Sequence, residues 1–190
     1  MRVDGLKHLS ALTNGWLMPG RLMAMCLVAV SLVAAPVQAK GTYYTLEQLL
    51  PEIFSATPDS QALWLNKDQK RMASDVLQRR FHKARVKYWR SGERYLWVLS
   101  EIGKEKPITF AVVTQAGMLE RIEVMAFREI RGDEIRMPAY TAQFRDLTLT
   151  DEQKLSQSID GISGATFSVR SMKKVAKLAL LLDRWTKPGA

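Results

Sequence analysis

Cysteine is nearly absent from this chain of 190 residues, because the only one, Cys26, lies in an apolar run near the N-terminus. Histidine is almost as scarce, and His82 is the only one beyond that run. Disulfides, thiolate metal sites, iron–sulfur clusters and c-type haem attachment all need cysteine, and a Ser-His hydrolase site or a metal site would lack parts. Any redox chemistry after the N-terminal segment therefore needs a cofactor that is held in another way. His82 stands among charged residues and is expected at the surface.

The segment 1–39 has the order of a secretory signal peptide. Its basic residues precede an apolar run at 22–35, and the small residues Val37 and Ala39 stand three places and one place before a cleavage site after Ala39. The apolar run is shorter than the roughly 20 residues that span a bilayer, which favours cleavage. We expect export to the periplasm, with an uncleaved inner-membrane anchor as the alternative.

The chain after this segment is basic, with 25 Lys and Arg against 18 Asp and Glu, a net charge of +7. Such a balance favours an acidic partner or association with an anionic membrane surface. A nucleic-acid partner is not expected for an exported chain. The hydrophobic fraction of 47% is enough for a folded core.

The N-terminal part of the mature chain has two helical patterns. A Thr-capped segment at 45–54 predicts a short helix that Pro51 bends or ends. A second amphipathic segment starts near Asn66 and runs to Phe81. Together they predict a helical lobe over 40–84.

The periodicity then changes to two, which is typical of strands. β-Branched and aromatic runs separated by turn signals predict an antiparallel sheet of four or five strands. We expect Trp89 and Trp97 to pack in or across this sheet, whereas Trp64 could mark a docking patch, although a core position is favoured for it too. The runs cover 85–89, 94–99, 108–113 and 119–127.

The C-terminal part is expected to end in a long amphipathic helix over 166–185, packed on the sheet. A charged block at 128–136 and a short helical piece at 138–144 precede it. The fold class predicted by the whole pattern is α+β. The apolar side of the last helix comprises Val169, Met172, Val175, Ala176, Ala179 and Leu182, and Lys173, Lys174 and Lys177 lie opposite.

The segment 160–166 stands immediately before that helix and carries the most specific motif. Helix N-termini offer unpaired N–H groups and a partial positive charge, so they bind phosphate well. Small residues keep the approach open, and two hydroxyls are at hand. From local chemistry alone, a plain Asp/Ser/Thr helix cap is the more common meaning of such a sequence. The residues concerned are Asp160, Gly161, Ser163, Gly164, Ala165 and Thr166.

The motif resembles the flavinylation motif of the FMN-binding domain family, which includes the C subunit of the sodium-pumping NADH:quinone reductase and the G subunit of the Rnf complex. The match covers Asp160, Ser163, Gly164, Ala165 and Thr166. The resemblance implies that a flavin transferase moves FMN from FAD onto the Thr166 hydroxyl as a phosphoester, and that Asp160 helps to position the acceptor loop. It is placed over 105–186, with 85–104 as connecting strands, and it is similar to small stand-alone periplasmic members of the family.

Other side chains are candidates to contact the flavin. Arg131 and Arg136 could donate to the ring carbonyls or ribityl hydroxyls, with Glu129 or Glu134 orienting them, although a charged block is as often a solvated loop. The aromatic residues Phe144, Phe167 and Tyr140 could lie against the ring or belong to the core.

The function expected from these observations is electron transfer. An exported protein with covalent FMN would relay electrons between a membrane-bound donor and an extracytoplasmic acceptor, with a flavin transferase and redox proteins as partners. An alternative is a flavin-dependent reductase acting directly on ferric iron or a quinone, although no dedicated acid or base is evident. A third possibility is a non-redox assembly factor, against which the intact Asp160 and Thr166 argue.

Overall fold

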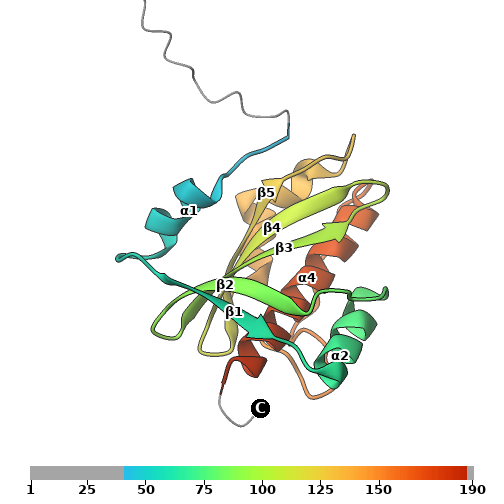
Figure 1. Ribbon diagram of the computed structural model, residues 1–190. Coiled ribbons are helices and arrows are strands. Elements are labelled where there is room, and N and C mark those ends of the chain that lie inside the picture. The colour runs from blue at the N-terminus through green and yellow to red at the C-terminus, as the bar shows by residue number, and fades with distance from the viewer. Residues whose placement is uncertain (1–40, 188–190) are drawn as a thin grey trace, which may run out of the picture. The chain divides into compact units, whose positions relative to one another are not determined.

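The structure is a computed structural model that describes residues 41–187 (Figure 1). The expected signal peptide and its cleavage site lie outside the described residues. Within 41–187, no helix combines the length and the apolar character needed to cross a bilayer.

The centre of the fold is a five-stranded antiparallel sheet in which sequence neighbours pair, so the order is β1-β2-β3-β4-β5. Four of the strands match the runs predicted from the period-two pattern. The first strand falls within 40–84, where only helices are expected. It is held by backbone pairing with β2, from Asp59 opposite Arg90 to Trp64 opposite Arg85. The strands are β1 (Asp59–Trp64), β2 (Arg85–Ser91), β3 (Arg94–Ile102), β4 (Pro107–Gln115) and β5 (Met118–Ala126).

One face of the sheet is covered by α4 (Thr166–Trp185), which matches the predicted helix (Figure 1). At about 1.5 Å per residue its 20 residues run about 30 Å. All six residues of its predicted apolar side are buried, and they pack with Trp97 and Phe110 of the sheet in one large cluster. The helix α2 (Lys67–Leu77), capped by Asn66, packs against α4 and buries Leu77 in this cluster.

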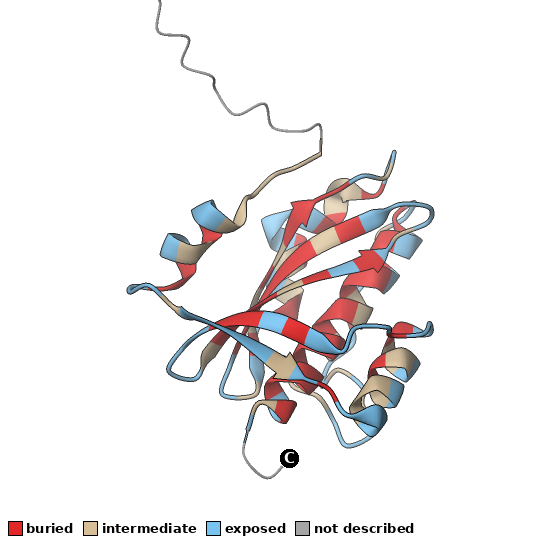
Figure 2. Cartoon of the chain, in the orientation of Figure 1, coloured by how far each residue is buried: buried red, intermediate tan, exposed pale blue. Residues whose placement is uncertain are grey.

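The opposite face carries α1 (Leu46–Ile53), whose capping box pairs Thr45 with Gln48. Pro51 lies inside the helix, which ends two residues later. Leu49 and Ile53 bury against Trp89 and Leu96 in a second, smaller cluster. Figure 2 shows buried positions on both sides of the sheet, so the sheet is a central layer between two unequal helical covers.

A compact connection leads from β5 to the start of α4. It consists of η1 (Asp133–Arg136), α3 (Pro138–Thr141) and η2 (Ala142–Phe144), which confirms the predicted short helical piece. The remaining chain up to Ala165 is loop apart from an isolated bridge between Leu149 and Leu155. The α+β fold class is thus confirmed.

The three tryptophans considered above differ in burial. Trp97 is fully buried and Trp89 is 9% exposed, as expected of core residues. The core prediction for Trp64 is wrong, because 67% of it is exposed at the end of the edge strand β1. The Arg85 guanidinium lies 5.6 Å from its ring centroid. His82 is exposed, as predicted.

Candidate functional site

The site is built around the first turn of α4. The N-cap residue is Ala165, and no side chain caps the helix, although Asp160 and Ser163 precede it closely. The plain-cap interpretation of the motif is therefore not what the structure has. Thr166 is the first helical residue and is exposed, and the first turn carries no acidic residue. A helix start of this kind leaves N–H groups and positive dipole character available to a phosphate.

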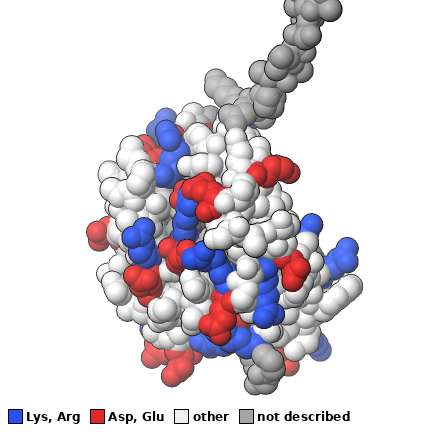
Figure 3. Space-filling view, turned by 90° about the vertical axis from the view of Figure 1, so that its left-hand side faces the viewer, with Lys and Arg blue, Asp and Glu red and all other residues white. Residues whose placement is uncertain are grey.

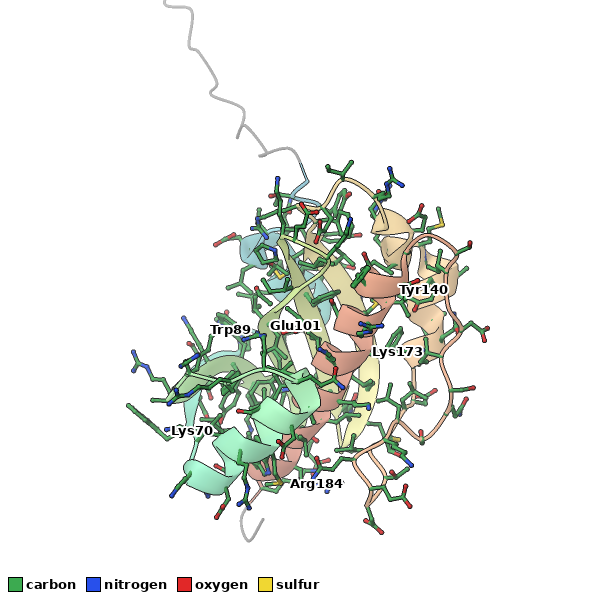
Figure 4. All side chains as sticks on the ribbon, turned by 90° about the vertical axis from the view of Figure 1, so that its right-hand side faces the viewer. Lys70, Trp89, Glu101, Tyr140, Lys173 and Arg184 are labelled. Atoms are coloured by element: carbon green, nitrogen blue, oxygen red, sulfur yellow. The ribbon has the colours of Figure 1, made fainter. Side chains whose placement is uncertain are left out.

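The loop that carries Asp160 is held by three hydrogen bonds to its backbone. The N–H of Asp160 donates to Oε1 of Gln143 at 2.9 Å, and the Tyr140 hydroxyl donates to the Asp160 carbonyl at 3.3 Å. Lys173 Nζ donates to the Ile159 carbonyl at 2.6 Å. Figure 4 shows Tyr140 and Lys173 on the same side of the molecule. The Asp160 side chain itself stays exposed.

The protonation state of Tyr140 fits this role. Its burial, together with the nearby Asp160 carboxylate, raises the pKa of Tyr140 to about 12. The phenol therefore remains a hydrogen-bond donor over the whole range in which proteins are stable. This makes Tyr140 a fixed clamp on the loop, with its ring edge-on to Phe144 at 6.0 Å in the core.

On one side of the α4 start lies a hollow of about 390 Å³, here called the Phe167 hollow. Its rim is apolar and exposed: Ile130 is 91% exposed and Phe167 is 47% exposed. It is also lined by charged groups, and Gly164, at φ +81°, leaves open space where a side chain would be. The residues that line it include Lys104, Glu129, Ile130, Arg131, Gly164 and Phe167.

Glu129 shapes the floor of this hollow. Its Oε1 accepts from the backbone N–H groups of Glu105 at 2.6 Å and Lys106 at 2.8 Å, which fixes the turn between β3 and β4. Partial desolvation acts to raise the pKa of Glu129, but the backbone donors outweigh it and hold the pKa below its ordinary value. Glu129 thus stays ionised and orders the hollow rather than the arginines.

The charged block approaches α4 closely at Gly132. This residue has φ +94°, and a Cβ there would lie 2.6 Å from the Ser168 Oγ and 3.5 Å from Ala165. Next to it, Oε2 of Glu134 is buried and has no hydrogen-bond partner among the described residues. A buried acceptor without a partner is costly, and such atoms mark places where a donor from a ligand or water belongs.

On the other side of the α4 start lies a hollow of about 440 Å³, here called the basic hollow. Thr166 faces it, and four cations of α4 line it without any Asp or Glu among the lining residues. Lys174 also lies 3.9 Å from the buried Glu101, which Arg79 pairs at 2.8 Å. The residues that line it include Gly161, Thr166, Arg170, Lys173, Lys174 and Lys177.

The structure brings some of the predicted site residues together, but not all. Thr166 lines the basic hollow, and Arg131, Gly164, Ala165 and Phe167 line the Phe167 hollow. Asp160 and Ser163 are exposed in the loop before α4 and line neither hollow. Arg136 lies elsewhere: its Nε is 3.3 Å from Asp133 and its guanidinium covers the ring of Tyr43 at 4.8 Å. Phe144 is fully buried in the core, where its ring meets Tyr140, so it lines neither hollow.

Two features of the site were not predicted from the sequence, namely the hydrogen bonds that hold the Asp160 loop and the basic hollow. Gln143 and Tyr140 lie 17 and 20 residues before Asp160, and nothing in the sequence signals their hydrogen bonds to its loop. The basic hollow did leave a signal. The spacing of its four cations puts them on one side of a helix: Arg170, Lys173, Lys174 and Lys177. The predicted basic side of α4 contains the three lysines but not Arg170.

The residues present fit a phosphate-linked flavin. An uncapped helix start would receive the phosphate, an exposed hydroxyl stands at that start, and an apolar-rimmed hollow next to it has a size within the roughly 300–1,000 Å³ typical of small-molecule sites. In the described part of the chain, no cluster of three or more His, Cys, Asp or Glu side chains could hold a metal ion. The fold and the site together fit a small domain that binds a phosphate-bearing cofactor.

A comparison of the sequence with models of known protein families indicates which cofactor this is. Residues 103–181 match the model of the FMN-binding domain. The match runs from the turn after β3 through the Asp160 loop to most of α4. It supports FMN as the cofactor and a flavoprotein as the kind of protein. No curated protein matches the chain.

Proposed function

We propose that this chain is an exported flavoprotein that carries FMN covalently on Thr166 and relays electrons. The observation that carries the proposal is the state of Thr166 within the matched domain. Its side chain is exposed at an uncapped helix start, where an enzyme can reach the hydroxyl and where N–H groups can stabilise the phosphate afterwards.

The chain's own residues have separate roles in this proposal. Tyr140, Gln143 and Lys173 hold the backbone of the Asp160 loop, and this loop would present the exposed Asp160 carboxylate to the transferase. The phosphate would lie at the first turn of α4. Bound FMN supplies one- and two-electron chemistry that no side chain of this protein offers.

The Phe167 hollow is the better receptor for the ring system. Ile130 and Phe167 offer apolar contact, and Arg131 offers N–H donors in a fixed fork that suits ring carbonyls. Because the rim is so exposed, a ring edge held there remains accessible to another protein. An accessible edge suits a carrier that exchanges electrons without binding a small substrate.

Export and the redox partners complete the proposal. The signal-like segment 1–39 supports a periplasmic location, where a flavin that dissociates is lost and a phosphoester prevents the loss. We place the protein between a membrane-bound electron donor and an extracytoplasmic acceptor.

The test is to export the protein together with a flavin transferase and to measure intact mass and in-gel fluorescence. Wild type should gain the mass of one FMN less one water. Thr166→Val should lose the label, because it removes the acceptor hydroxyl at similar size. Ser158→Ala is the matched control, since Ser158 is also exposed in the loop before α4 but lies outside the motif, and it should keep the label. Colourless wild type, or a label that Thr166→Val retains, would refute the assignment.

A further inference from the structure

The basic hollow has more positive charge than the cofactor needs. Arg170, Lys173, Lys174 and Lys177 are spaced i, i+3, i+4 and i+7, which puts all four on one side of α4. They begin one turn after Thr166. Figure 4 looks onto this side of the molecule, with Lys173 on α4 and Lys70 on α2 labelled.

Little of this charge is neutralised within the protein. Among residues 41–187, Arg170, Lys173 and Lys177 form no ion pair, and only Lys174 has a carboxylate, Glu101, at 3.9 Å. Lys173 and Lys174 donate to neutral acceptors instead, the carbonyls of Ile159 at 2.6 Å and Leu77 at 2.7 Å. A phosphodiester on Thr166 would bring one negative charge against three cations that lack a carboxylate partner.

The side of the sheet that α1 covers carries surfaces of both kinds. There Arg121 pairs with Glu52 at 2.8 Å and with Glu123 at 2.7 Å. Figure 3 shows basic and acidic side chains next to one another over the face that it presents. A hollow of about 520 Å³ on β1 and β2 is lined by Lys83, Arg85 and Lys87, and it too has no Asp or Glu among its lining residues. What sets the basic hollow apart is therefore its place at Thr166 and not its positive charge alone.

We propose that the basic hollow and its four cations are the docking site for an acidic surface patch of a redox partner protein. The inference rests on the proposed function for its meaning, because the patch would then lie next to the flavin on Thr166. Transient redox complexes have small interfaces, and complementary charge governs how fast and in which orientation they form. Carboxylates that enter the hollow would orient the partner toward the cofactor.

The shape of the site favours a protein over a membrane. Lys173, Lys174 and Lys177 are half-buried along a concavity of about 440 Å³, and the ammonium groups of Lys173 and Lys174 donate to backbone carbonyls. A flat layer of lipid headgroups would contact basic side chains that protrude from the protein, and these lysines are recessed. Asp and Glu side chains that protrude from a protein surface can instead reach into the hollow.

The first test uses unflavinylated protein and a fluorescein-labelled peptide of ten glutamates, followed by fluorescence anisotropy. The variant is Arg170→Gln with Lys177→Gln, because neither side chain holds a loop carbonyl. Its affinity should fall about tenfold at low salt, the factor expected for losing two charge pairs about 6 Å apart at high dielectric. Lys83→Gln with Lys87→Gln removes the same charge from the other cation-lined hollow, on β2 and the loop before it, and should bind like wild type.

The second test uses the flavin-loaded protein and small oxidants of opposite charge. Ferricyanide is a trivalent anion and hexaammineruthenium(III) is a trivalent cation. The Arg170→Gln, Lys177→Gln variant should reoxidise several-fold more slowly with ferricyanide and faster with the ruthenium complex, and both effects should shrink in about 0.5 M salt. Equal reoxidation rates in variant and wild type would mean that the charge of the basic hollow does not act on electron transfer at the flavin, and they would overturn the proposal.

Other outcomes of the peptide test also decide the matter. An equal loss in the Lys83, Lys87 control would mean that only net charge acts. If the Arg170, Lys177 variant lost binding to vesicles of one part phosphatidylglycerol and three parts phosphatidylcholine but bound the peptide normally, the surface would be a membrane contact. Because the peptide test needs no flavin, colourless protein with intact peptide binding would refute the covalent flavin alone, and labelled protein without peptide binding would refute the docking site alone.

Discussion

Gly132 is where the charged block meets α4, and its replacement by alanine tests how the site is built. Two separate costs are expected. The residue has φ +94°, which L side chains avoid, and the new Cβ would lie 2.6 Å from the Ser168 Oγ. Ser168 is 3% exposed, so its hydroxyl has little room to move away.

The magnitude follows from these two terms. A non-glycine residue in this backbone region costs about 1–2 kcal/mol, and overpacking of a close contact adds about 1–2 kcal/mol. Gly132→Ala should therefore lower the free energy of unfolding by about 2–4 kcal/mol. For a domain of this size that is a fall in Tm of roughly 5–15 °C. FMN attachment to Thr166 should also slow, because the displaced block shifts Ile130 and Arg131 at the Phe167 hollow.

Urea denaturation followed by tryptophan fluorescence measures the stability, and two glycines give matched controls. Gly92 has φ +60° with open space where a Cβ would stand, so Gly92→Ala should cost only about 1 kcal/mol. Gly161 has neither problem, and Gly161→Ala should be close to neutral. In a double-mutant cycle, Ser168→Ala should recover about 1 kcal/mol in the Gly132→Ala background. Equal stability of the Gly132 and Gly92 variants, or no coupling to Ser168, would refute the close approach.

Three further predictions concern two buried carboxylates and one loop-holding amide. Burial raises the pKa of Asp183, and weaker interactions with Lys187, Thr114 and Gly117 only partly offset it, so the ionised carboxylate destabilises the folded state. Asp183→Asn should therefore raise Tm by a few degrees at pH 7. The gain should vanish near pH 3, where the carboxyl group is protonated in both the folded and the unfolded state. A Tm gain that persists at pH 3 would contradict this sign. Glu101→Gln should lower the free energy of unfolding by about 2 kcal/mol in urea melts, because it weakens the bonds to Arg79 and Lys174; an unchanged midpoint would contradict a structural ion pair. Gln143→Ala should slow flavin attachment severalfold in a mass-based time course at a stability cost of only about 1 kcal/mol, and normal attachment would remove Gln143 from the loop clamp.

Much of the sheet could be predicted because its strands show their burial in the sequence. In β3, Tyr95, Trp97 and Leu99 bury toward α4, whereas Leu96 lies in the cluster with α1. A strand covered on both faces still announces itself through a run of apolar and β-branched residues. The same reasoning predicted α4 with its bounds, since its apolar side repeats over five turns.

The strand β1 could not be predicted for the converse reason. Its segment Asp59–Trp64 is almost entirely exposed, and its polar first half is followed by an apolar second half, so it carries no period-two pattern. It is a strand because its backbone completes the edge of β2. The second helix likewise ends at Leu77, before the expected Phe81, because Gln78 adopts a left-handed conformation and the Phe81 N–H donates to the Ser74 hydroxyl at 3.0 Å.

For the site, the motif predicted the position of Thr166 but not its surroundings. A short motif specifies local backbone, and Thr166 is indeed the first residue of α4. The charged block is not one unit, because the 3-10 turn η1 lies within it: Arg131, before the turn, lines the Phe167 hollow, while Arg136, at its end, lies against Tyr43. The turn starts at Gly132, whose close approach to Ser168 of α4 is a long-range contact that residue spacing in the block does not reveal.

The helix α4 links stability to the candidate function. It contributes more residues to the main core cluster than any other helix, and its start and outward side present Thr166, the proposed acceptor, and the four cations. A helix held so firmly by burial needs no cofactor to keep its place, so the uncapped first turn should exist before any phosphate is attached. Attachment would then add charge compensation to a helix end that is already positioned. Under the proposed function, a transferase would therefore act on the folded protein, and the cations further along α4 would remain available for a partner because they lie outside the turn that the phosphate would occupy.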